Sequence, residues 1–459
     1  MDVVIGAGMG GLACAVALAR KGREVTVIEA RDGPGGLAAG MELEGRTYDG
    51  GPYILLDQPG LAWAFERLGM DLAEHVELIR LEEVYRVRTP RGKMRIHRDL
   101  EQTADGLERT FPGAGKPYVA FVREMAEVYG ALAPVQRGPR PRPWHLLREG
   151  RWRHAPFLLR PLGRVLDRTG LPGPVKDALG IWTHIAGQPL AEAPSPLAFV
   201  PAIVHTVGAY TVKGGIGRIP EALEREARRL GVVFRYGAPV ERIPRVGRKV
   251  EGVVVRGDLV RAEQVFSNTP AITTLTRLAD PPDPALTARL QALPLQSPGI
   301  GVWMAAEETG DDLAFLEFLL PGNDEKVRLR VLPGMVDPTR RGTARLVHPV
   351  DHDWAQAVGE PGQRDRLRQI LEEPWWREGL DGVRVLETRV PVEWGRSHHL
   401  WRDSMNPVMT AAFMRQGRIP HHGLLADNLH LVGSSTHPGQ WVSFCAISGV
   451  VAAGGGGGV

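Results

Sequence analysis

The first 29 residues constrain the fold of this chain more than any other stretch. The sequence opens with the short apolar run DVVI, continues into GAGMGGLACAVALARKG, and then reaches a second apolar run, EVTVIE. Gly6, Gly8 and Gly11 have the G-x-G-x-x-G spacing of the turn in a dinucleotide-binding βαβ unit. The first glycine allows a tight turn, the second lets the backbone approach a pyrophosphate, and the third lets the helix pack close to the strand.

The context of this glycine triplet makes the prediction specific. In a chain with 56 glycines among 459 residues, about one triplet of this spacing is expected by chance. Here a strand precedes the triplet, a helix follows it and stops at Gly22, and Glu29 stands roughly 20 residues after the turn, where an acid binds the ribose. We therefore predict a dinucleotide site with the pyrophosphate at the helix N-terminus.

Composition and motif content narrow the class of protein. The length favours two domains, and 43% hydrophobic with 24% charged residues is typical of a globular protein. A net charge of +3 argues against a nucleic-acid binder. Cys14 and Cys445 form no C-x-x-C pair, so we exclude a dithiol centre and expect buried thiols. The sequence shows neither a signal-peptide pattern nor an apolar run of roughly 18 residues, which favours a cytoplasmic protein without a membrane span.

Two later stretches return to the pattern of the N-terminus. VKGGIGRIPEALEREARRLGVVFRYGAPVERI contains a glycine loop, a helix and strands, and NLHLVGSSTHPGQWVSFCAISG reads as strand, loop and helix. We therefore predict an α/β fold in which a Rossmann-like nucleotide domain is interleaved with a mixed α+β substrate domain. The nucleotide domain takes residues 1–75, 206–275 and 425–459, and the substrate domain takes residues 76–205 and 276–424.

An arginine-rich segment over residues 137–168 has two possible interpretations. It contains nine arginines but only Glu149 and Asp167 as acids, interleaved with Trp144, Trp152 and several leucines. Such a mixture is typical of an element that binds the interface of a membrane. A solvated arginine-rich loop explains the pattern equally well, so both interpretations stay open.

The sequence offers little support for a metal or a second cofactor. The pairs His398/His399 and His421/His422 are the only histidine neighbours, and adjacent residues on a strand point to opposite faces, so we expect no metal site. No second G-x-G-x-x-G opens a βα unit, which argues against a bound nicotinamide domain.

Together, several motifs resemble one known family over nearly the whole chain. DVVIGAGMGG, YDGGPYIL, VKGGIGRIPEALEREARR, VFSNTP and NLHLVGSSTHPGQWVSFCAISG are similar to motifs of carotenoid desaturases of the phytoene desaturase type, within the amine-oxidase-like FAD superfamily. The resemblance implies FAD as cofactor, a glutathione-reductase-like FAD domain and a lipophilic polyene as substrate. It also implies a peripheral enzyme on the inner face of the membrane, with quinone or oxygen as electron acceptor.

The resemblance also assigns cofactor contacts, although it singles out no catalytic side chain. In this sequence the matching positions run from the pyrophosphate and ribose contacts, through the second glycine pair and the adenine strand, to the last helix at the flavin ring: Gly6, Gly8, Met9, Gly10, Gly11, Glu29, Ala30, Arg31, Gly35, Gly36, Gly51, Pro52, Val240, Asn268, Gly433, Gln440, Trp441 and Val442.

Three departures from the family pattern leave the substrate open. Leu37 stands where the family usually has arginine, PGQWVSF is less glycine-rich than usual, and TVKGG replaces an aromatic–proline pair. We expect hydride transfer from an allylic C–H of a carotenoid to N5 of the flavin. A polyene or retinoid reductase or isomerase, an amine or porphyrinogen oxidase, and a non-catalytic FAD-fold protein remain alternatives.

Overall fold

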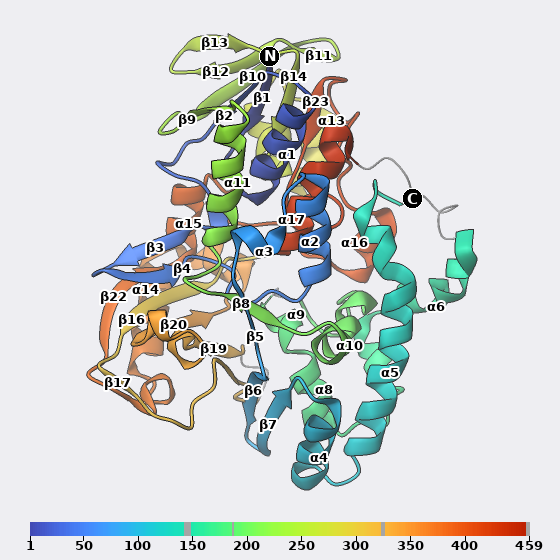
Figure 1. The fold of residues 1–459 in the computed structure, drawn as a ribbon, viewed down its shortest axis with the longest axis vertical. Helices are drawn as coiled ribbons and strands as arrows, with labels where there is room; N and C mark the ends of the chain where they lie inside the picture. Colours follow the sequence, from blue (N-terminus) through green and yellow to red (C-terminus); the bar gives the residue numbers. More distant parts are fainter. Residues whose placement is uncertain (142–147, 186–187, 323–325, 456–459) are drawn as a thin grey trace.

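A five-stranded parallel sheet forms the centre of one half of the molecule. The computed structural model describes residues 1–141, 148–185, 188–322 and 326–455. In spatial order the strands are β23 (Leu429–Leu431), β14 (Gln264–Ser267), β1 (Asp2–Ile5), β2 (Val25–Ile28) and β9 (Val233–Arg235), at the top of Figure 1. The sheet takes strands from the beginning, middle and end of the chain, which confirms the predicted interleaved α/β fold.

Helices cover one face of this sheet. The first two strands are mostly apolar and are buried along their whole length, as expected for a parallel sheet covered on both faces. The helices on this face are α1 (Met9–Arg20), α2 (Gln58–Arg67), α3 (Leu72–His75), α11 (Arg218–Arg229) and α17 (Val442–Val450). A Cβ atom on Gly449 of α17 would lie 2.2 Å from the carbonyl oxygen of Gly10, so α1 and α17 cross at very short distance.

A smaller antiparallel sheet covers the other face. Its strands are β10 (Val240–Val246), β11 (Lys249–Val250), β12 (Gly252–Val255) and β13 (Asp258–Arg261), with β15 (Ala279–Asp280) beside β10, and α12 (Ala271–Thr273) and α13 (Pro284–Gln291) pack next to it. Two further pairs connect the halves: β3 (Gly40–Leu43) with β4 (Arg46–Asp49), and β5 (Leu78–Arg80) with β8 (Tyr210–Val212). The first of these pairs is a hairpin whose turn contains Gly45.

A seven-stranded mixed sheet organises the second half of the molecule. In spatial order its strands are β22 (Arg384–Arg389), β16 (Ile300–Ala305), β20 (Thr343–His348), β19 (Arg328–Val331), β18 (Leu316–Leu319), β6 (Glu83–Thr89) and β7 (Gly92–His97). A short pair, β17 (Glu308–Thr309) with β21 (Leu380–Asp381), stands apart. Helices α14 (His352–Glu372) and α15 (Pro391–His398) border the same region in Figure 1.

A helical layer packs against the β18–β6–β7 end of that sheet. Its members, at the lower right of Figure 1, are α4 (Leu100–Thr110), α5 (Gly115–Leu132), α6 (Ala155–Leu158), α7 (Leu162–Leu166), α8 (Gly173–Leu179), α9 (Ile181–Ile185) and α10 (Phe199–Thr206). The five-segment division of the sequence into two domains stays a prediction.

The arginine-rich segment is divided between core and surface. Leu162 and Leu166 are buried in the helical layer, whereas Trp152 and Leu159 are 58% and 57% exposed. The guanidinium of Arg415 in α16 (Ala411–Gln416) donates a hydrogen bond to the Leu159 carbonyl, which places the segment beside α16 at the edge of the molecule (Figure 1). Trp144 belongs to the range 142–147, which is outside the described residues. No helix in the described ranges is long and apolar enough to cross a bilayer.

Candidate cofactor and substrate site

One large cavity lies where the two halves meet. Its volume is about 860 Å³, and it begins at the carboxyl ends of the parallel strands, where Ile5, Ile28, Asn268 and Ser434 line it. Ligands of open α/β sheets bind at this edge. All of the predicted cofactor contacts line this cavity except Gly11 and Gly433.

We divide the cavity into two named parts. The nucleotide lobe is formed by the glycine turn, residues 29–31, Gly35, Gly36, Val240 and Asn268. The substrate lobe is formed by residues 53–56 together with Trp182, Leu197, Val200 and Val347. Both lobes belong to one continuous cavity, so a ligand in one can reach a ligand in the other.

Close packing inside the protein requires glycine at the positions of this turn. Gly6 has φ +90°, and a Cβ atom on Gly11 would lie 2.0 Å from the Gly6 carbonyl oxygen, which is the helix-to-strand packing predicted for the third glycine. A Cβ atom on Gly8 would lie 2.5 Å from Nδ2 of Asn268, and one on Gly10 would lie 2.7 Å from the Gly433 Cα. Gly11 and Gly433 therefore support the lobe from behind its lining.

The N-terminus of α1 supplies donors to the nucleotide lobe. Gly8 caps this helix without a side-chain hydrogen bond, and the first intrahelical bond runs from the Leu12 N–H to the Gly8 carbonyl. The first N–H groups of a helix have no intrahelical acceptor, and Met9 and Gly10, which open α1, both line the cavity. Free N–H groups and the positive end of the helix dipole suit a diphosphate, so this lobe fits a dinucleotide.

Glu29 holds the turn and keeps acceptor capacity for a ligand. Its buried carboxylate accepts hydrogen bonds from the Ala7 N–H at 2.6 Å and from the Arg31 N–H at 2.8 Å. A carboxylate offers about four lone-pair positions, so two remain for ribose hydroxyls. The sequence predicted the ribose contact, while these two backbone bonds only become visible in the fold.

Arg31 and His398 form a second polar contact in the nucleotide lobe. Nη1 of Arg31 donates to the Gly36 carbonyl at 2.8 Å and lies 3.1 Å from Nε2 of His398. Burial lowers the pKa of His398 to about 3, and the positive charges of Arg31 and Arg389 act in the same direction. His398 is therefore neutral at physiological pH and accepts from Arg31.

The histidine pairs do not lie on strands, contrary to our expectation. His398 ends α15, His399 is its left-handed C-cap residue, and His421 and His422 lie in the loop before β23. Across the described ranges, no group of three or more His, Cys, Asp or Glu side chains is arranged to hold a metal ion.

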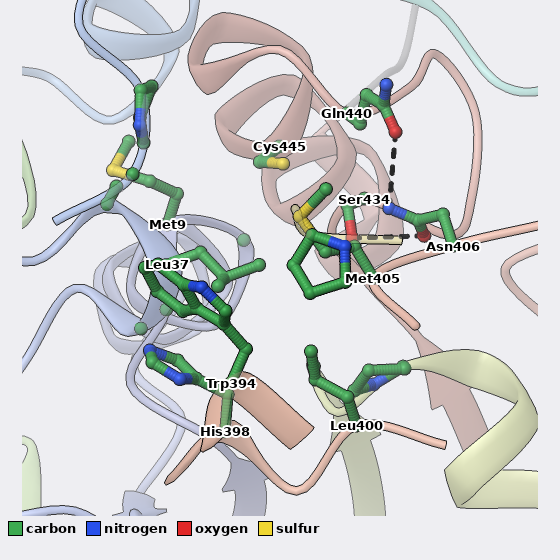
Figure 2. A pocket seen from close by; sticks show the side chains of 18 of the residues that line it. Met9, Leu37, Trp394, His398, Leu400, Met405, Asn406, Ser434, Gln440 and Cys445 are labelled. Atoms are coloured by element: carbon green, nitrogen blue, oxygen red, sulfur yellow. Dashed lines mark hydrogen bonds between the residues drawn. The ribbon is translucent and has the colours of Figure 1, made fainter. Parts of the chain in front are cut away.

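A hydrogen-bonded edge and an apolar edge face each other in Figure 2. Asn406 donates to Oε1 of Gln440 at 3.3 Å and accepts from the hydroxyl of Ser434 at 3.3 Å. Leu37, in place of the family arginine, lines the apolar edge with Trp394. The departure at Leu37 thus exchanges a charged lining for an apolar one.

The N-terminus of α17 is the second helix end at the cavity. Its cap residue Trp441 stacks on Phe444 with ring centroids 4.8 Å apart, and both Trp441 and Val442 line the cavity. The first intrahelical bond runs from the Cys445 N–H to the Trp441 carbonyl. Burial raises the pKa of the Cys445 thiol to about 12, so this cavity-lining thiol is protonated and unreactive.

The substrate lobe was not predicted residue by residue. Its lining is mostly aliphatic and aromatic, and it comes from the loop after Gly51, the helical layer and β20. These side chains carry no local motif, because each belongs to an ordinary apolar run that becomes a cavity wall only after folding.

Two helix ends, a glycine turn and a buried carboxylate, next to an apolar lobe, are typical of the class of dinucleotide-dependent oxidoreductases. Comparison with known proteins narrows the class. The chain belongs to the flavin-containing amine oxidoreductase family, whose model matches residues 9–454, and its cofactor is FAD.

Three similar proteins illustrate the range of this family. The zeta-carotene-forming phytoene desaturase of Myxococcus xanthus is 31% identical over 97% of this chain and 92% of its own. The hydroxyneurosporene desaturase of Cereibacter sphaeroides is 32% identical over 62% of this chain and 59% of its own. A structure of wild-type putrescine oxidase bound to putrescine superposes with a TM-score of 0.65 at 20% identity, covering 99% and 98% of the two chains, which shows a shared fold.

Proposed function

We propose that this protein desaturates a lipophilic polyene of carotenoid biosynthesis and delivers the hydride to N5 of FAD. The observation that carries the proposal is the continuity of the two lobes, which lets an apolar chain reach a flavin held by the glycine turn. The similarity to the phytoene desaturase of Myxococcus xanthus over nearly the full length supports the same substrate class.

The described residues suit the binding of FAD part by part. The N-terminus of α1 would hold the diphosphate, Glu29 the ribose and the backbone at Val240 the adenine. FAD, when bound, supplies a hydride acceptor at N5. The N-terminus of α17, whose first N–H groups have no intrahelical acceptor, would stabilise negative charge on the adjacent ring.

The substrate lobe positions the polyene and keeps water away from it. Its lining residues, among them Leu55, Leu197 and Val347, offer contact to an extended apolar chain. Holding an allylic C–H in the reactive orientation supplies most of the rate in such a reaction, with little need for acid–base groups. Water or a weak base then removes a proton from the resulting cation, and this loss completes the new double bond.

Delivery of such a substrate requires contact with a lipid phase. Trp152 and Leu159 are exposed, and Arg153 and Arg164 of the same segment are exposed as well. We include membrane-surface binding by this segment in the proposal, with quinone or oxygen as the electron acceptor. The Trp152→Ala/Leu159→Ala variant is expected to lose most of its binding to anionic vesicles while keeping its flavin.

The test is anaerobic mixing of the FAD-loaded protein with liposomes that contain phytoene or neurosporene, followed by absorbance. Bleaching of the flavin together with a red shift of the polyene is the expected result. Full flavin occupancy without a response to either polyene, but with bleaching by an amine or a porphyrinogen, would overturn it. A polyene reductase would instead blue-shift the substrate using reduced flavin, and an isomerase would leave the flavin oxidised.

A further inference from the structure

The cavity has an opening to solvent next to the nucleotide lobe, and cationic side chains border this opening. Most residues of the cavity lining are buried or half-buried, whereas five of the described ones are exposed: Pro239, Arg277, Arg396, His399 and Arg402. A residue that lines a cavity and is also exposed borders its opening. Pro239 directly precedes Val240 of the nucleotide lobe, so this opening leads into that lobe.

Two of these arginines come from different segments and lie near each other. Arg277 belongs to the single turn Thr274–Leu278 that follows α12, whereas Arg402 belongs to the loop that follows α15. The guanidinium carbon of Arg277 lies 4.5 Å from the ring centroid of Trp401, the residue next to Arg402 in the chain. The opening therefore has a cation on each of two sides.

The loop that carries Arg402 has an unusual backbone that packing holds in place. His399, Arg402 and Asp403 have φ values of 52°, 48° and 58°, in the left-handed region that residues other than glycine seldom adopt. Nε2 of His352 donates to the Arg402 carbonyl at 2.9 Å, and a Cβ atom on Gly395 would lie 1.8 Å from Oδ1 of Asp403. Such strained residues are found most often at sites that bind ligands.

The charges of Arg277 and Arg402 are not neutralised by the protein. Arg396 forms an ion pair with Glu360 at 2.9 Å. Across residues 1–141, 148–185, 188–322 and 326–455, neither Arg277 nor Arg402 forms an ion pair. Asp403, which is half-buried, is the acid in this part of the lining. The opening is therefore positively charged at neutral pH, because a guanidinium does not lose its proton in this range.

This charge suits the cofactor better than the substrate. FAD carries negative charge on the diphosphate that the glycine turn receives, whereas a polyene hydrocarbon carries none. Cations around the opening of a cleft raise the association rate of an anion by about 10- to 1,000-fold, and salt removes the effect. In Figure 1, α15 lies at the left and α6 at the right, so the opening and the segment proposed to bind membranes lie on different sides of the molecule.

We propose that this cationic opening is the entrance for FAD, and that Arg277 and Arg402 accelerate its entry by attracting the diphosphate. The two arginines act on the rate of association. The rate of dissociation depends on the nucleotide lobe, where the bound cofactor makes its contacts. The inference needs only FAD as the cofactor, so it holds for any substrate that the enzyme oxidises.

The experiment mixes full-length apoprotein with FAD and follows the quenching of flavin fluorescence, which gives the association and dissociation rate constants. Wild type is compared with Arg277→Gln/Arg402→Gln at ionic strengths of about 10 mM and about 500 mM. At the lower ionic strength we expect association to be about 5- to 20-fold slower in the variant, and at the higher one we expect a difference within about twofold. Dissociation is expected to be equal, with full flavin occupancy at saturating FAD.

Three controls separate the local charge from other causes. Arg91→Gln/Arg109→Gln removes two exposed arginines near β7 and α4, at the bottom of Figure 1, and is expected to change FAD association by less than about twofold. Arg277→Lys/Arg402→Lys keeps both charges and is expected to associate within about twofold of wild type. Riboflavin, which lacks the diphosphate, is expected to associate at the same rate with every variant.

Several outcomes would overturn the inference. One is equal FAD association in wild type and the double glutamine variant at low ionic strength. Another is a slower association that riboflavin shares or that persists at high ionic strength, since this would indicate a distorted opening. Faster dissociation with unchanged association would assign the two arginines to contacts with bound FAD. Association of the lysine variant as slow as that of the glutamine variant would exclude charge as the cause.

Discussion

The nucleotide lobe and the substrate lobe differ in the atoms that line them and in the length of chain that supplies them. The nucleotide lobe is made largely of backbone, with glycines fixed by contacts such as that between Gly11 and the Gly6 carbonyl. The substrate lobe is made of side chains from the helical layer, β20 and the loop after Gly51. A cofactor common to a family is bound by the first kind of surface, and a substrate that varies within the family by the second.

The largest expected effect comes from a substitution that disrupts the nucleotide lobe. Gly11→Ala places a Cβ atom against a backbone oxygen that cannot move aside, so we expect a loss of about 3 kcal/mol or more in the free energy of unfolding, and protein purified without flavin. Gly33→Ala is the matched control, because no atom lies within 4 Å of its added methyl group. Equal flavin content in both variants would show that the turn tolerates the methyl group.

A smaller effect is expected when the carboxylate of the same lobe is neutralised. Glu29→Gln keeps the shape but replaces an acceptor by a donor that faces the N–H groups of Ala7 and Arg31. FAD affinity should fall about 10- to 100-fold, corresponding to one unsatisfied buried group. Titration of apoprotein with FAD measures the change, and the exposed Glu24→Gln serves as reference. Unchanged affinity would argue against the ribose contact.

The substrate lobe should respond in the opposite way. Leu197→Trp fills part of this lobe, so we expect kcat/KM for a polyene to fall about 10-fold or more while FAD affinity stays equal. Leu197→Met preserves the volume and should retain activity. If Leu197→Trp released FAD as readily as Glu29→Gln, the two lobes would not be separable.

The smallest expected effect concerns acid stability. Burial lowers the pKa of His421 to about 3, so the folded state stays neutral there while the unfolded chain binds a proton below about pH 6.5. Stability is therefore full above pH 6.5 and decreases as the pH falls toward 3. His421→Gln preserves the contact to Ser448, so urea unfolding should show it losing about 1–2 kcal/mol less than wild type between pH 7 and 5. If wild type and His421→Gln lost equal amounts of unfolding free energy over this pH range, His421 would be excluded as a source of the acid sensitivity.

The contrast between the lobes also explains what the sequence could predict. The βαβ unit and the return of strands near both Val240 and Gly433 follow from local periodicity and turn residues, and the fold confirms them. Arg277, Arg402 and Trp182 were not predicted, because their role depends on which wall a residue faces after distant segments pack. Likewise, Asn268 was expected near the cofactor, but its packing against Gly8 required the fold.

The position of β23 and α17 in the chain affects when the cofactor can be bound. β23 completes the sheet next to β14, and α17 packs on α1 through Gly10 and Gly449, yet about 400 residues separate them from β2. At roughly 5–20 residues per second, a ribosome needs on the order of 20–80 s to cover that distance. The glycine turn is therefore synthesised early but lacks its contacts with β23 and α17 during most of synthesis. Binding of the flavin consequently follows translation.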